Sequence, residues 1–295
     1  MDILAVNRSP RKVFTPPPNQ VMSNTKLDLF NEIPSTLVEL YSGDDLEGLF
    51  PGGFINFGYY DGINIDSMTE KDRIQSQRNL YKHVTDKLNI TPNDSILEIG
   101  IGHGGGPAWT AENFALKKIT AIDIFANHVE LAKKNFKAQV EKYPLFYEQA
   151  VAENLPFSNG SQDGIYTIEA FQHFTNQQKF IEEAGRVLKS SRNIVISTFL
   201  LTDDKLYEDG CKLIPKIAIG PSDLDRHDHI ITARQLSDEL EKNGFIDIKI
   251  ESIGEHVWTG YNKWVAATEN NWDLGWFKSY KSGILDYYIV TGTKK

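Results

Sequence analysis

The sequence predicts an α/β fold in which a mostly parallel sheet carries helices on both faces. Short β-branched and apolar runs alternate with segments of helical spacing between about residues 69 and 243. Such repetition is typical of parallel sheets, because parallel neighbours need a crossover connection. The last two strand runs, 246–252 and 284–291, have no convincing helix between them, so we expect an antiparallel pair at one sheet edge.

The expected elements divide the chain into three parts. Residues 1–24 contain three consecutive prolines and predict a flexible N-terminal arm, and residues 25–68 predict a helical cap that ends in an aromatic loop. The third part, 69–295, alternates helices at 69–88, 107–116, 126–140, 172 or 176–188 and 232–243 with strands at 95–99, 119–124, 145–149, 164–168 and 193–198. Residues 200–231 and 254–283 are expected lid elements, although the aromatic side chains of the second segment fit a satellite core equally well.

Composition bounds the class of protein and its partners. No apolar run of about 18 residues occurs, so no membrane span is expected, and the first residues lack the apolar stretch of a secretory signal. The single cysteine, Cys211, excludes an internal disulfide and suits a reducing compartment, from which we expect a cytoplasmic location. A net charge of −9 argues against a nucleic-acid partner. A homodimer stays open.

A glycine-rich loop follows the first predicted strand, at residues 100–106. Glycine is favoured where the backbone approaches a bound group closely, because it has no Cβ and adopts positive φ. The acid Glu98 interrupts an apolar strand and needs a partner, for which a ligand amine is suitable. Asp123 closes the second strand, where an acid that holds a ribose belongs. The loop also satisfies G-x-G-x-x-G, so a dinucleotide remains the alternative ligand.

Together these motifs resemble the class I S-adenosylmethionine-dependent methyltransferases. The segment 97–104 is similar to their first motif, and segments 153–157, 163–174 and 186–197 are similar to the ends of their third, fourth and fifth strands. The resemblance covers roughly residues 70–293. Segments 57–60 and 169–173 resemble the branch that acts on small molecules such as sugars, polyketides, quinones, terpenoids and sterols. The resemblance implies a Rossmann-like, seven-stranded, mostly parallel sheet with an antiparallel last strand, and S-adenosyl-L-methionine as cofactor.

The resemblance also implies roles for individual residues. The methionine end of the cofactor is expected at Glu98 and at the loop amides of Gly100, Gly102 and Gly104, the ribose at Asp123, the adenine against Ile124, and the carboxylate near Tyr60 or Tyr59. Family members often carry an aspartate where this chain has Val151. Adenine is therefore expected to use the Ala152 amide and Glu153.

Two side chains near the end of the fourth strand are catalytic candidates. His173 is the first choice as the base for a hydroxyl substrate, because imidazole titrates near neutrality. Glu169 lies closer to the strand end and is expected to contact cofactor or substrate. A packing or capping role is the alternative for both residues. The expected substrate contacts are Tyr59, His227, His229 and Trp258.

The expected activity is methylation of a hydroxyl on a small, partly hydrophobic metabolite. A carbon or nitrogen target is the alternative; for an alkene carbon, Glu169 and aromatic rings would stabilise a cation. A nicotinamide-dependent oxidoreductase and an inactive cofactor-binding module are the alternatives of another class. Asp225, His227 and His229 alternate as metal ligands do, but such polar runs are usually solvated, and no metal is expected.

Overall fold

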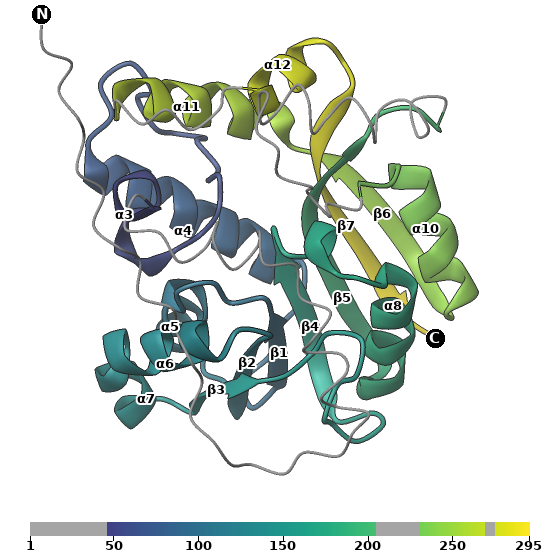
Figure 1. Ribbon diagram of the computed structural model, residues 1–295. Coiled ribbons are helices and arrows are strands. Elements are labelled where there is room, and N and C mark those ends of the chain that lie inside the picture. Colours follow the sequence, from purple (N-terminus) through teal and green to yellow (C-terminus); the bar gives the residue numbers. More distant parts are fainter. Residues whose placement is uncertain (1–45, 205–229, 269–274) are drawn as a thin grey trace, which may run out of the picture. The chain divides into compact units, whose positions relative to one another are not determined.

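The computed structural model describes residues 46–204, 230–268 and 275–295 (Figure 1). The chain divides into two units, Met1–Glu32 and Ile33–Lys295, and all of the described residues belong to the second. The N-terminal arm, residues 25–45 of the expected cap and residues 205–229 of the expected 200–231 lid segment lie outside the described residues.

One sheet of seven strands, in the order β3-β2-β1-β4-β5-β7-β6, organises the described residues. The strands are β1 (Ser95–Ile99), β2 (Lys118–Asp123), β3 (Leu145–Gln149), β4 (Gln162–Ile168), β5 (Leu188–Leu201), β6 (Phe245–Ser252) and β7 (Leu285–Lys294). β1 to β5 pair in parallel, whereas β7 runs antiparallel to both β5 and β6. The predicted sheet, including its antiparallel last strand, is confirmed.

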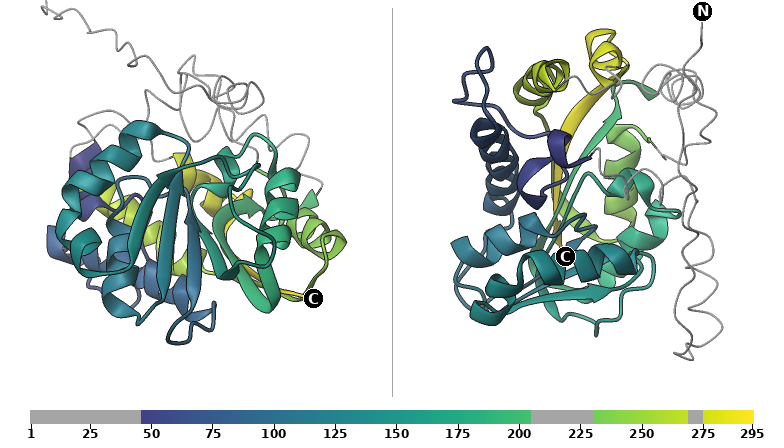
Figure 2. Two further views of the ribbon diagram at one scale, coloured as in Figure 1. Left: turned by 90° about the horizontal axis from the view of Figure 1, so that it is seen from below. Right: turned by 60° about the vertical axis from the view of Figure 1, so that its left-hand side comes forward.

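Side chains of the central strands alternate between two hydrophobic cores, one on each face of the sheet. On β1, Ile96 belongs to one core, and Leu97 and Ile99 belong to the other. The first core is completed by α4 (Glu70–Asp86), α5 (Gly105–Asn113), α6 (Ala126–Asn135) and α11 (Gly254–Ala267), and the second by α8 (Gln177–Val187) and α10 (Ala233–Lys242). Helices cover both faces, as Figure 2 shows. This arrangement explains why the strands read as nearly continuous apolar runs.

Side-chain caps fix where the predicted helices begin. Thr69 accepts a hydrogen bond from the amide of Asp72, whose carboxylate accepts from the Thr69 amide, which forms a capping box for α4. Asn176 caps α8 through the amide of Lys179, which selects the later of its two predicted starts. The residues before it form a short 3-10 turn, η2 (Phe171–His173).

The structure differs from the prediction in two helical regions. The single helix expected at 126–140 is broken at Phe136 into α6 and α7 (Lys137–Lys142). The expectation of no helix between the last two strands is wrong, because α11 and α12 (Gly275–Lys281) lie there. In α11 the buried side chains recur at helical spacing, from Val257 to Val265. Two glycines and several aromatic residues of modest helix propensity concealed this pattern.

The segment before α4 wraps over the glycine-rich loop. It contains α3 (Leu46–Leu49), the 3-10 turn η1 (Pro51–Gly53) and an irregular aromatic stretch at 54–60. Its side chains are largely buried: Phe54, Phe57 and Tyr60 belong to the first core. An ordered aromatic loop was predicted here, and we call residues 54–60 the aromatic loop.

Among the described residues, no helix combines the length and the apolar character needed to cross a membrane.

Candidate active site

A pocket opens at the carboxyl ends of β1, β2 and β4, where the strand order reverses between β1 and β4. Open α/β sheets bind their ligands at such points. The pocket holds about 850 Å³ of empty space, its open mouth included. Its wall is mostly apolar, and it contains the predicted residues Gly100, Gly102, Asp123, Ile124, Ala152, Glu153, Glu169 and His173. Eight site residues predicted from separate motifs are thus brought together.

Close packing explains the glycines of the loop after β1. Gly100 has φ +79°, and a Cβ added there would lie 2.2 Å from the Cβ of Ala170. Gly104 has φ +88°, and its added Cβ would lie 2.4 Å from the Cβ of Ala132. Any side chain at these positions would push the loop away from the sheet. Gly104 forms the base of the loop and begins α5, outside the pocket wall.

Asp123 is held rigidly at the edge of the pocket by backbone amides. Its Oδ2 accepts from the amides of Ile101 (3.1 Å) and Gly102 (3.3 Å), and its Oδ1 accepts from the amide of Phe125 (2.9 Å). The Nδ1 of His128 lies 3.4 Å from Oδ1. His128 is buried in the pocket wall and was not predicted. Its position in the first turn of the helix after the acid is the signal that identifies it in hindsight.

Glu169 ends β4 with one carboxylate oxygen occupied and the other available. Oε1 accepts from the amide of Phe57 (2.7 Å) and from the hydroxyl of Tyr287 (2.9 Å). Among the described residues no group donates to Oε2, and that atom is not sealed from the open space of the pocket. Burial raises the pKa of Glu169 to about 7, against the opposing effect of the two donors. Its backbone is left-handed, with φ +52°.

His173 lies beside Glu169 with its ring oriented by Gln172. The Gln172 amide nitrogen donates to the backbone oxygen of Glu169 (2.7 Å) and lies 3.2 Å from Nε2 of His173. Its amide oxygen accepts from the hydroxyl of Thr198 (3.0 Å), which fixes the orientation of the amide. His173 Nε2 is therefore the acceptor of this contact, and its lone pair is directed at Gln172.

Glu98 lies away from the pocket, on the other face of β1 from Ile99. It is fully buried, and its two oxygens accept from the hydroxyls of Tyr81 (2.7 Å) and Tyr166 (2.5 Å). Burial raises the pKa of Glu98 to about 8. The role implied for Glu98 at the methionine end of the cofactor stays a prediction.

Three further predicted residues, Tyr59, Tyr60 and Trp258, lie in the aromatic cap, which we define as the aromatic loop and α11. Tyr60 and Trp258 are buried within it, and neither contributes to the pocket wall. Tyr59 stacks on His83 at 4.8 Å between ring centroids. His227 and His229 lie outside the described residues. Within the described ranges, no three metal-ligating side chains gather into a site.

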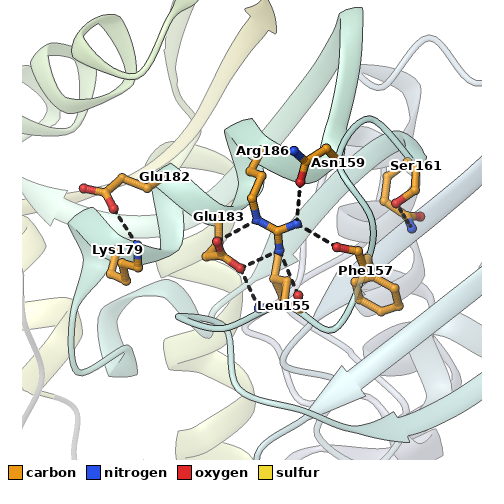
Figure 3. A network of polar contacts seen from close by, with 9 residues as sticks. Leu155, Phe157, Asn159, Ser161, Lys179, Glu182, Glu183 and Arg186 are labelled. Carbon is orange, nitrogen blue, oxygen red and sulfur yellow. Dashed lines mark hydrogen bonds and ion pairs between the residues drawn. The ribbon is translucent and has the colours of Figure 1, made fainter. Parts of the chain in front are cut away.

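A complete polar clamp holds the loop that follows β3, whose residues Ala152 and Glu153 line the pocket (Figure 3). Arg186 Nε and Nη2 donate to the carboxylate of Glu183 (2.8 and 2.7 Å), and its remaining hydrogens reach the backbone oxygens of Leu155 (2.9 Å) and Phe157 (2.7 Å) and the side chain of Asn159 (3.0 Å). The Leu155 amide donates to Glu183 (2.9 Å). All five guanidinium hydrogens are thus used.

Comparison with known proteins finds similarity to methyltransferases. Residues 97–196 match the model of the methyltransferase domain. The chain is 28% identical over 205 residues to an O-methyltransferase of Pyrenophora dematioidea, covering 70% of this chain and 73% of that protein. It is 23% identical over 234 residues to the erythromycin 3''-O-methyltransferase of Saccharopolyspora erythraea, covering 76% and 72%.

The fold is also shared with solved methyltransferases. A geranyl diphosphate methyltransferase, solved with geranyl diphosphate and sinefungin, superimposes with a TM-score of 0.75 at 12% identity, over 91% of this chain and all of that one. The glycine-rich loop after β1 and the acid that ends β2 both lie within the matched residues 97–196. The matched family model, the two relatives and the shared fold support a class I S-adenosylmethionine-dependent methyltransferase.

Proposed function

We propose that this protein transfers the methyl group of S-adenosylmethionine to a hydroxyl of a small, partly hydrophobic acceptor, with Glu169 as the general base. The observation that carries this proposal is the carboxylate of Glu169, which lines the pocket with Oε1 occupied and Oε2 available. A pKa raised to about 7 suits a group that must accept a proton near neutrality.

The character of the pocket wall fits this cofactor better than a dinucleotide. Its carboxylates are Asp123, Glu153 and Glu169, and no lysine or arginine of the described residues lines it. Three acids favour a sulfonium cation and oppose a diphosphate. Asp123 would hold the ribose hydroxyls, and the apolar side chains of Ile122 and Ile124 would contact the adenine.

The chain supplies orientation, exclusion of water and a proton acceptor, whereas the bound cofactor supplies the electrophilic methyl group and its thioether leaving group. The fixed carboxylate of Glu169 would bind the acceptor hydroxyl and take its proton on Oε2 as the oxygen becomes nucleophilic. Glu169 would then be neutral, and Oε1 would keep both of its donors.

His173 was the first choice as base from the sequence, and that expectation remains to be tested. Its Nε2 lone pair is directed at Gln172 and not into the pocket, which favours Glu169 over His173 as the base. The two assignments predict different variants: His173→Ala would lower turnover moderately if the ring contacts the acceptor, and by about 10²-fold or more if it is the base.

Carbon methylation is the second candidate, favoured by the aromatic rings next to Glu169. Phe57, whose amide donates to Glu169, stacks on Tyr261 at 4.3 Å, and Phe199 lies 4.4 Å from Trp276. Such rings stabilise a developing cation, as an alkene acceptor would require. The names of the two curated relatives support oxygen as the target, and the name of a solved geranyl diphosphate C-methyltransferase from Streptomyces coelicolor supports carbon.

The experiment incubates the protein with cofactor carrying a deuterated methyl group and a panel of metabolites, and identifies labelled products by mass spectrometry. Product NMR then separates methyl ethers from C-methylated compounds. Glu169→Gln should retain cofactor affinity and lower turnover by about 10²–10⁴-fold, because it removes the proton acceptor but keeps the shape. Undiminished turnover by Glu169→Gln would refute the assignment of the base.

A further inference from the structure

We infer that Tyr287 is a positioning residue that sets the proton affinity of Glu169 and leaves Oε2 as the oxygen that accepts the proton. Tyr287 lies on β7, in the antiparallel part of the sheet, 118 residues from Glu169 in sequence. The inference rests on the proposed function, since it gives a role to a partner of the proposed base.

A directional chain of hydrogen bonds ends on Glu169. The Tyr287 hydroxyl donates to Oε1 at 2.9 Å, and the Ser197 hydroxyl lies 3.1 Å from the same tyrosine oxygen. Because Tyr287 has one hydrogen and gives it to Glu169, Ser197 must be the donor in the second contact. Burial and the carboxylate of Glu169 raise the pKa of Tyr287 well above its ordinary value, so the phenol stays protonated and remains a donor.

The two hydroxyl side chains that form this series of hydrogen bonds are buried in the protein interior. Tyr287 and Ser197 each have 0% exposure, on neighbouring strands β7 and β5. A buried hydrogen bond to a carboxylate is stronger than one exposed to water, because no solvent competes for either group. The Tyr287 bond therefore has a large effect on the ionised form of Glu169 and a smaller effect on the neutral form.

The backbone of Glu169 is held by hydrogen bonds on both sides, so the carboxylate is kept within reach of its two donors. Its amide donates to the backbone oxygen of Ser197 at 2.8 Å, and its own carbonyl accepts from the side chain of Gln172. The second donor to Oε1, the Phe57 amide, comes from the aromatic loop. Two donors on one oxygen leave the other for the acceptor hydroxyl.

The other charged and titratable groups near Glu169 are few among the described residues. The positive charge of Arg73 on α4 lowers the pKa of Glu169. The negative charge of Glu169 in turn raises the pKa of Tyr60 in the aromatic loop. His173 from η2 and Asp123 from β2 line the same pocket. These groups are unchanged when the Tyr287 hydroxyl is removed, so any shift that follows reports on Tyr287.

The sign of the expected effect follows from which form the bond stabilises. Tyr287→Phe removes a donor to the carboxylate, so the pKa of Glu169 rises. A base must be ionised, so activity falls as pH drops through that pKa, and the acidic limb of the kcat/KM profile moves to higher pH. We expect a shift of about one pH unit.

The experiment compares pH profiles of kcat/KM for the wild type, Tyr287→Phe, Ser197→Ala and Tyr288→Phe, with the carbon-13 shift of the Glu169 carboxyl measured in the cofactor-free protein. Tyr287→Phe should move both the acidic limb and the carboxyl titration upward by about one pH unit, with the high-pH plateau kept within about threefold. Ser197→Ala should shift both in the same direction by less. Tyr288→Phe is the matched control, because its side chain packs in the other core, and it should shift neither.

The outcomes distinguish a failure of the inference about Tyr287 from a failure of the proposed function. A lower plateau in Tyr287→Phe with an unmoved limb and an unmoved carboxyl titration would mean that Tyr287 is only structural. If that occurs while Glu169→Gln is inactive, the inference fails and the proposed base stands. If Glu169→Gln keeps both full activity and the acidic limb, the proposed function itself is wrong. Should Tyr287→Phe not fold, Ser197→Ala carries the same test.

Discussion

The loop after β3 and the aromatic cap border the same pocket region but are held by opposite means. The loop is held by Arg186, every hydrogen of which has a partner on Glu183, Asn159 or the backbone (Figure 3). The aromatic cap is held by stacked rings, such as Phe57 on Tyr261, together with separate hydrogen bonds from α4 side chains to backbone oxygens of the aromatic loop. Charge-assisted hydrogen bonds fix the orientation of the groups that they join, whereas stacked rings can shift past one another at little cost.

The two regions also differ in how many buried polar atoms have partners. In and beside the cap, several sealed atoms have none among the described residues: Asn56 Nδ2, Arg73 Nε, Gln77 Oε1 and Trp258 Nε1. Each such atom costs about 1–3 kcal/mol relative to a paired one. The clamp carries no comparable cost. We therefore expect the cofactor side of the pocket to be preformed and the cap to be the side that rearranges when an acceptor binds.

The largest effect is expected from emptying the centre of the cap. Trp258→Ala should lower the free energy of unfolding by about 3–5 kcal/mol, because the side chain has 0% exposure and packs against Phe57 and Phe199. Trp258→Phe should cost less than half as much, because it keeps a ring and removes an N–H that has no partner. Denaturant unfolding measures both. Equal losses in the two variants would show that the N–H is satisfied and would break the contrast with the clamp.

The next largest effect is expected in the clamp. Arg186→Lys keeps the charge but loses the planar fork, so we expect a loss of about 2–3 kcal/mol in unfolding free energy and a weaker affinity for S-adenosylmethionine. Lys179→Ala is the matched control on the same helix, because its ion pair with Glu182 is exposed, and it should change stability by less than about 1 kcal/mol. Denaturant unfolding measures the stability of each variant, and calorimetric titration of the folded protein measures its affinity for S-adenosylmethionine. Unchanged cofactor affinity in Arg186→Lys would show that the clamp does not contribute to cofactor binding.

An effect that depends on pH concerns Glu98, which is fully paired yet costly to ionise. Folding raises its pKa to about 8 from an ordinary 4.5, so the folded state keeps a proton that the unfolded state releases. Stability from this group is full below about pH 4.5 and is lost as pH rises toward 8. Glu98→Gln should flatten that decline by up to about 1.4 kcal/mol per pH unit. The measurement is unfolding free energy at several pH values, and parallel curves for the two proteins would contradict it.

Local patterns sufficed for most of the fold and for the pocket edge. Apolar runs and glycines located β1 and the loop after it, and the acid at a strand end located Asp123, since these signals lie within a few residues. Period two along β1 also indicates that Glu98 faces away from Ile99, which the resemblance to the family had obscured. Aromatic residues concealed the helical spacing of α11.

The long-range contacts of the site had no sequence signal. Glu169 meets Phe57 across 112 residues and Tyr287 across 118, and neither distance in sequence predicts a hydrogen bond. Such pairings depend on how the strands are ordered in the sheet, and the order becomes visible only in three dimensions.

The most direct test of the account is a crystal structure of the protein with S-adenosylhomocysteine. We expect the ribose hydroxyls against the carboxylate of Asp123 and the sulfur facing the open oxygen of Glu169, with the clamped loop unmoved. An adenosyl group bound elsewhere, or a ribose out of reach of Asp123, would contradict the central claim that this pocket delivers the methyl group.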